Sequence, residues 1–106
     1  MNINLFNPSN ESELNALLQS TTVVVDCYAP WCAPCKIIGP FFEQISTELP
    51  SVSFLKVNIE LFPEFAKQNN IRNVPTIIIF KNNAPSAKLI GFTSEQKLRD
   101  FITINA

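Results

Sequence analysis

The sequence of 106 residues contains no histidine and only three cysteines. The absence of histidine excludes proteases that use a Cys–His pair, and it excludes metal sites ligated by imidazole. A structural zinc site typically needs four protein ligands, and three thiols do not supply them. An odd number of cysteines also does not build the disulfide framework of a small secreted protein. We therefore expect a reducing, cytoplasmic compartment.

An excess of one charge and long apolar runs are also missing. The net charge is −1, so nothing indicates a nucleic-acid partner. No apolar run approaches the length that spans a bilayer, and the first six residues do not read as a secretory signal. Because 46% of the residues are hydrophobic, we expect a single globular domain over residues 1–106, monomeric by default and without membrane contact.

The most informative stretch that is present runs Trp31-Cys32-Ala33-Pro34-Cys35-Lys36. An apolar run precedes it and a pattern with helical spacing follows it, so Cys32 is predicted at the start of a helix. The unpaired N–H groups there and the positive end of the helix dipole both favour a thiolate. Cys32 is thus the candidate nucleophile. Cys35, one turn further on and better shielded, is the candidate partner for a disulfide.

A cysteine pair with this spacing has two other common uses, in zinc sites and in structural disulfides. Zinc binding lacks ligands, as argued above. A purely structural disulfide that closes so short a loop removes little chain entropy, so it would stabilise the protein little. Redox chemistry is the better use of this spacing.

Asp26 is the second informative residue, because it lies inside an apolar strand pattern that leads into the cysteines. Burial there would favour the neutral acid, and we expect Asp26 to exchange a proton with Cys35, through water. The alternatives are a helix cap or an ion pair with a lysine. Lys56, in the middle of the next strand pattern, lies near Asp26 if the two strands are neighbours; otherwise it is a solvated lysine. Cys27 should face away from Asp26 as a small buried residue.

The remaining pattern alternates strands and helices. Asn10 with Glu13, and Thr93 with Gln96, resemble capping boxes that start the first and last helices. The helix after Cys32 has a broad apolar face. Its members are Ile37, Ile38, Phe41, Phe42, Ile45 and Leu49. Strands are expected near residues 2–6, 21–29, 52–59, 77–80 and 87–92, and a short helix near 62–70.

Two features of the second half bear on the site. Pro75 should occupy the first position of a strand, because it has no N–H to donate to a sheet. From the residues alone, the Val74–Pro75 bond is open between cis and trans. Gly91, one of two glycines, either permits close approach of a ligand backbone or forms a bulge.

Taken together, these residues resemble the thioredoxin family along essentially the whole chain. The resemblance rests on Asp26, the Trp31–Lys36 motif, Pro40, Lys56, Val74-Pro75-Thr76 and Gly91, in the family's order and approximate spacing. It implies an α/β fold, the thioredoxin fold, with a central mixed sheet of about five strands flanked by about four helices. It also implies a cis Val74–Pro75 bond beside the cysteines.

The resemblance further implies a function. A protein-disulfide reductase would cycle Cys32 and Cys35 between dithiol and disulfide through a mixed disulfide, with Asp26 as proton acceptor and donor. Thioredoxin reductase would restore the dithiol with electrons from NADPH, so no cofactor is expected on this chain. Target proteins that contain disulfides would bind at six positions. These are Trp31, Ala33, Pro34, Val74, Pro75 and Gly91.

The sequence departs from the family at several positions. Ala33 stands where the family most often has glycine, Cys27 and Tyr28 replace larger aromatic residues, and Asn82-Asn83 replaces an Asn-Gly turn. Two other functions therefore remain open. One is an oxidase or isomerase, although such proteins often place a histidine between the cysteines. The other is a binding module in which redox turnover is incidental.

Overall fold

The computed structural model describes residues 3–106, which form five strands and four helices. In chain order these are β1 (Leu5–Phe6), α1 (Glu11–Leu17), β2 (Thr22–Tyr28), α2 (Ala33–Glu48), β3 (Ser53–Asn58), α3 (Pro63–Gln68), β4 (Thr76–Lys81), β5 (Ala84–Ile90) and α4 (Glu95–Asn105). The first strand is shorter than the sequence predicts, and residue 2 lies outside the described residues.

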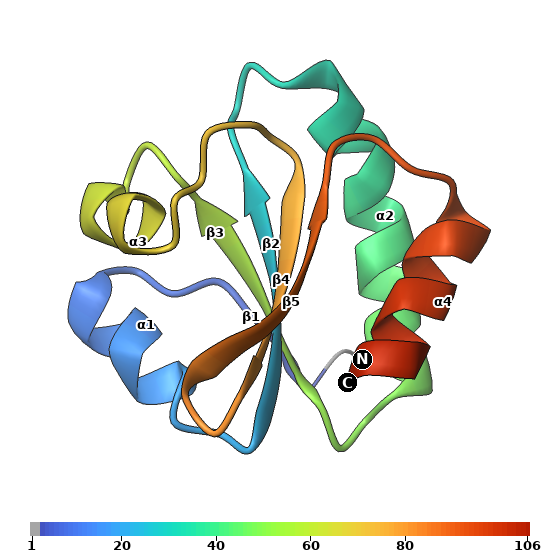
Figure 1. Ribbon diagram of the computed structural model, residues 1–106, viewed down its shortest axis with the longest axis horizontal. Helices are drawn as coiled ribbons and strands as arrows, with labels where there is room; N and C mark the ends of the chain where they lie inside the picture. Colours follow the sequence, from blue (N-terminus) through green and yellow to red (C-terminus); the bar gives the residue numbers. More distant parts are fainter. Residues whose placement is uncertain (1–2) are drawn as a thin grey trace.

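The strands form one mixed sheet in the order β1-β3-β2-β4-β5. β1 and β2 both run parallel to β3, while β4 is antiparallel to β2 and to β5. Figure 1 shows α1 and α3 on one face of this sheet and α2 and α4 on the other. The expected α/β architecture with a mixed sheet is confirmed. β2 lies at the centre because its apolar residues can be covered on both faces.

Successive residues of β2 point to opposite faces of the sheet. Val23, Val25 and Cys27 pack in the hydrophobic core beneath α1 and α3. Val24 packs with Ile38 and other residues of α2 in a second core. The same alternation places Asp26 on the α2 face, opposite Cys27, as predicted. The carboxyl group is therefore aimed at the helix that carries the cysteines.

Several sequence predictions were wrong in detail. Ile37 is half exposed, because it lies about 100° around α2 from the buried Ile38. The cap of α4 is Ser94, whose hydroxyl accepts from the Lys97 N–H, and Thr93 lies outside the helix. β5 begins at Ala84 and ends at Ile90 rather than spanning 87–92. The sequence pattern did not predict a strand before residue 87, because proline is unusual inside a strand and Pro85 lies there. The pairing of β4 with β5 is irregular near this proline.

Other local predictions were confirmed. The side chain of Asn10 accepts from the Glu13 N–H at the start of α1. Asn82 and Asn83 both adopt positive φ, 52° and 64°, and form the tight turn between β4 and β5. Asparagine tolerates this region better than most residues, so the missing glycine is accommodated.

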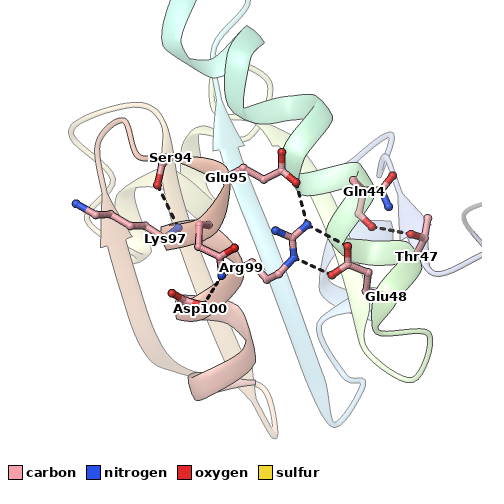
Figure 2. A network of polar contacts seen from close by, with 9 residues as sticks. Gln44, Thr47, Glu48, Ser94, Glu95, Lys97, Arg99 and Asp100 are labelled. Atoms are coloured by element: carbon pink, nitrogen blue, oxygen red, sulfur yellow. Dashed lines mark hydrogen bonds and ion pairs between the residues drawn. The ribbon is translucent and has the colours of Figure 1, made fainter.

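Arg99 ties α4 to α2 on the surface of the protein. Its guanidinium bonds both carboxylate oxygens of Glu48 on α2, at 2.8 and 3.0 Å, and also bonds Glu95 on its own helix. Figure 2 shows the guanidinium between the two carboxylates. The paired contacts fix the orientation of the two helices that cover the face to which Asp26 points.

Candidate functional site

The loop after β2 delivers the two cysteines to the start of α2. Cys32 is the N-cap residue, and its Sγ accepts a hydrogen bond of 3.2 Å from the Cys35 N–H. Pro34 occupies the first turn, where its missing N–H has no helical partner to lose. The expected position of Cys32 at a helix start is confirmed. Negative charge on sulfur is favoured at this point, because free N–H groups and the helix dipole both face it.

Cys32 and Cys35 are joined in a disulfide with their Cα atoms 5.3 Å apart. Cys32 is 3% exposed and Cys35 is 5% exposed, so the greater shielding expected for Cys35 is not seen in the oxidised form. Ala29 packs against the pair, together with the half-buried Val74. Little of either cysteine is therefore exposed to solvent in the oxidised form.

Asp26 is buried beneath the disulfide. It is 1% exposed, and its buried Oδ1 has no hydrogen-bond partner among residues 3–106. Burial raises the pKa of its carboxyl from 3.8 to about 7; Lys56 lowers the pKa and Glu43 raises it. The helix cap is Cys32, so Asp26 has no capping role. A carboxyl that titrates near neutral pH can both take up and release a proton.

Lys56 lies directly opposite Asp26 in the pairing of β2 with β3, which confirms the expected proximity. Its ammonium, however, makes its ion pair with Glu43 at 2.9 Å. The same nitrogen lies 5.9 Å from the centre of the Tyr28 ring. The ammonium is thus held between α2 and the end of β2. Glu43 is a residue that the sequence predictions missed.

A signal for Glu43 was present in the sequence. Cys35, Gly39 and Glu43 are spaced by four residues, so they share one side of α2. All three line a cavity of about 320 Å³, which Asp26 and Lys56 also line. This volume is large enough for several water molecules, since a water occupies about 30 Å³.

The Val74–Pro75 bond is cis, in agreement with the resemblance, and Pro75 is buried immediately before β4. The N–H of Gly91 donates to the Pro75 carbonyl at 2.9 Å. Gly91 has φ of +92°, a conformation that favours glycine, and no atom lies within 4 Å of where a Cβ would stand. Glycine is therefore required here by the backbone, and it borders open space.

Trp31, Ala33 and Pro34 are exposed beside the disulfide. The indole of Trp31 is 69% exposed, and its N–H donates to Glu60 Oε2 at 2.7 Å. Glu60 follows β3, a neighbour of β2, and no sequence pattern indicated its contact with Trp31. Of the six expected target-binding positions, Val74 packs against the disulfide and Gly91 bonds Pro75.

Cys27 lies apart from this site as a free, fully buried thiol. Burial raises its pKa well above the ordinary value, with smaller effects from Asp26 and Lys88. Within residues 3–106 no three His, Cys, Asp or Glu side chains group as metal ligands. In the same range, no helix combines the length and apolarity needed to cross a bilayer.

Comparison with known proteins gives a consistent result. A family profile described as Thioredoxin matches residues 6–104. Thioredoxin of Mycoplasmoides gallisepticum is 38% identical over 95 residues, covering 89% of this chain and 95% of the relative. Thioredoxin-1 of Saccharomyces cerevisiae is 36% identical over 92 residues, covering 87% and 88%. The structure of Plasmodium falciparum thioredoxin superposes with a TM-score of 0.88 at 30% identity, covering 94% of this chain and 98% of that one.

The profile covers nearly the whole chain, and the cysteine pair lies at the start of α2 in the motif Trp-Cys-x-x-Cys. Disulfide and dithiol are the two states that such a pair exchanges with the disulfides of other proteins. The chain belongs to the thioredoxin family and is a thiol–disulfide oxidoreductase that acts through Cys32 and Cys35.

Proposed function

We propose that this protein reduces disulfides in other proteins, with Cys32 as the nucleophile and Cys35 as the resolving thiol. The single observation that carries the proposal is the position of Cys32 as N-cap of α2, with the buried Asp26 behind the pair. The helix start stabilises a thiolate at Cys32. The buried Asp26 can accept the proton of the Cys35 thiol.

In the first step, the Cys32 thiolate attacks one sulfur of a target disulfide. The target S–S bond breaks, one target sulfur leaves as a thiolate, and the other is bound to Cys32 in a mixed disulfide. In the second step, Cys35 loses its proton to Asp26, and its thiolate attacks Cys32 Sγ. The second target sulfur then leaves. The target has gained two electrons, and Cys32 and Cys35 end as a disulfide.

Asp26 suits the second step because its pKa of about 7 leaves part of the population ionised near neutral pH. The cavity that Asp26 and Cys35 share gives water a route between the carboxyl and the thiol. Lys56 acts on this step indirectly, through the field it exerts on Asp26. Asp26 returns the proton to solvent before the next cycle.

Targets are proposed to bind over the exposed surface that adjoins Cys32. Trp31, Ala33 and Pro34 offer side-chain contacts on one side of the disulfide. Val74 packs against the disulfide, and Gly91 is bonded to the Pro75 carbonyl. These three residues are proposed to form the other part of the target-binding surface, where the backbone before Pro75 would pair with an extended target segment. The proposal includes thioredoxin reductase as the partner that restores the dithiol with electrons from NADPH. It also includes a monomeric, single-domain protein, residues 1–106, working in the cytoplasm on cell redox homeostasis.

The reduction potential of the Cys32–Cys35 pair, measured against a dithiothreitol or glutathione buffer, tests the direction of electron flow. We expect a value near the roughly −270 mV of a disulfide reductase. A value between about −180 and −120 mV would instead mean that Ala33 has retuned the centre towards oxidation or isomerisation.

Two variants test the residue roles. Cys35→Ser should accumulate the mixed disulfide with a target, detectable by non-reducing electrophoresis and mass spectrometry. Cys32→Ser should form none. A binding module would retain its biological role in both variants, and loss of that role in either would exclude this alternative.

A further inference from the structure

The ion pair between Glu43 and Lys56 lines the Asp26 cavity, and the steps described above give Glu43 no role. Lys56 projects from β3 onto the α2 face, directly across from Asp26. Its nitrogen lies 2.9 Å from Glu43 Oε2. Asp26 Oδ1 meanwhile has no hydrogen-bond partner in the described part of the chain, although Lys56 lies on the adjacent strand. The ammonium is thus paired with Glu43, while its strand position places Lys56 next to Asp26.

We propose that Glu43 is a positioning residue for thiol–disulfide exchange, which holds the Lys56 ammonium off Asp26 and so sets how readily the buried carboxyl takes and gives up its proton. The proposal rests on the proposed role of Asp26 in the second step. Its physical basis is that an ammonium brought close to a buried carboxyl stabilises the ionised form strongly, while one engaged by another carboxylate does so less.

The surroundings of Lys56 support this geometry. The ammonium passes beside Gly39, where an added Cβ would lie 3.6 Å from the nitrogen. The ring of Tyr28 borders it on another side. The side chain of Lys56 is 22% exposed and that of Glu43 is 43% exposed, whereas Asp26 is 1% exposed. The ion pair therefore lies on the solvent side of the cavity, and Asp26 lies at its buried side.

The other groups that face Asp26 leave Lys56 as the adjustable charge. On α2 the cavity is lined by Cys35, Lys36 and Glu43, and Lys36 is exposed to solvent. On β4 the residue paired with Asp26 is Ile77, which carries no charge. The charges that affect the Asp26 pKa are those of the same two residues: Lys56 lowers the pKa and Glu43 raises it. Each effect is smaller than that of burial.

The test is a titration of the Asp26 carboxyl carbon by NMR in the intact oxidised protein. Glu43→Gln removes one negative charge and loosens the hold on Lys56, so we expect the titration midpoint to move down by about one pH unit. Glu48→Gln removes the same charge from the same helix, where its partner is Arg99, and should leave the midpoint in place.

A double-mutant comparison separates positioning from the direct field of Glu43. In a Lys56→Gln background, Glu43→Gln should move the Asp26 midpoint by less than half as much as in the wild type. An equal shift in both backgrounds, or no downward shift in Glu43→Gln alone, would overturn the proposal. A merely structural contact would alter the unfolding transition without moving the midpoint.

The pH profile of mixed-disulfide release then separates this proposal from the proposed role of Asp26. If both hold, Glu43→Gln moves the profile to lower pH together with the NMR midpoint. If the midpoint moves and the profile does not, the positioning by Glu43 stands and the proton-transfer role of Asp26 fails.

Discussion

The indole N–H of Trp31 donates a hydrogen bond of 2.7 Å to a carboxylate oxygen of Glu60. The two residues lie at the ends of neighbouring parallel strands, β2 and β3, which brings their loops to the same edge of the sheet. A large aromatic side chain that is 69% exposed would otherwise sample several rotamers. The bond to Glu60 restricts the ring beside Cys32, on the surface where we propose that targets bind.

We expect Glu60→Ala to release the indole. Because the sequence has one tryptophan, the fluorescence anisotropy reports on Trp31 alone. It should fall when the contact with Glu60 is lost and the indole moves more freely. The KM for a disulfide-containing peptide should rise by about two- to fivefold, because an exposed hydrogen bond to a carboxylate contributes roughly 1 kcal/mol or less. Glu64→Ala, at the exposed start of α3, is the matched control and should change neither quantity. An unchanged anisotropy in Glu60→Ala would contradict the ordering role.

The burial of Asp26 predicts that stability depends on pH. The carboxyl has a pKa of about 7 in the folded protein and about 3.8 when exposed, so between these values the folded state binds the extra proton. Stability must then fall as pH rises through this window and level off above it. At about 1.4 kcal/mol for each unit of pKa, the difference corresponds to about 4 kcal/mol.

Asp26→Asn removes this titration. We expect the variant to be more stable than the wild type above pH 7, by on the order of 2–4 kcal/mol, and nearly equal to it below pH 4. Urea unfolding at a series of pH values measures the difference. A wild-type slope that survives in Asp26→Asn would show that another group carries the pH dependence.

The two glycines predict opposite effects of an added methyl group. Gly39 is helical and its Cβ would make an ordinary contact of 3.6 Å, so Gly39→Ala should stabilise α2 by about 0.5–1 kcal/mol. Gly91 has positive φ, so Gly91→Ala should destabilise the protein by about 1–2 kcal/mol despite the open space around it. Chemical denaturation of both variants decides this, and equal effects would refute the backbone argument.

The local sequence pattern predicted the positions of Asp26 and Lys56 in the site. The contacts that were missed join segments that are distant in the sequence. The strand pattern around Asp26 was enough to place it opposite Cys27 and beside Lys56, because strand alternation and parallel pairing determine both relationships. The partner of Lys56 was not predicted, since it depends on how α2 lies across the sheet. The same holds for the contact of Trp31 with Glu60, which joins two loops.

Errors at the ends of elements had local causes. Ser94 and Thr93 carry equivalent hydroxyls, and sequence does not distinguish which one meets the first free N–H of α4. Pro85 is unusual inside a strand, yet β5 lies at the edge of the sheet, where a missing donor is tolerated. In both places the observed structure depends on the surrounding fold, which the local sequence does not reveal.

Asn4 closes the C-terminal end of α2 from outside the helix. Its amide nitrogen lies 2.8 to 2.9 Å from the carbonyls of Ser46, Leu49 and Val52, so its two N–H groups are shared among three acceptors. Carbonyls at a helix end have no partners within the helix, so a side chain that supplies donors there stabilises the whole element. Because α2 carries Cys32 and Cys35 at its other end, Asn4 also contributes to the stability of the site.

We expect Asn4→Ala to destabilise the protein by about 1–2 kcal/mol, since the carbonyls of Ser46 and Leu49 then keep only their backbone N–H partners and the carbonyl of Val52 loses its bond to the amide. Asn4→Asp should cost more at pH 7, because a carboxylate would face carbonyl oxygens at the negative end of the helix dipole. The excess cost of Asn4→Asp over Asn4→Ala should shrink as pH falls and the carboxylate is protonated. Urea unfolding at pH 7 and pH 4 measures it, with Asn15→Asp on the exposed side of α1 as the control for added charge. If Asn4→Asp and Asn4→Ala are equally stable at pH 7, the amide does not act as a donor to the end of α2.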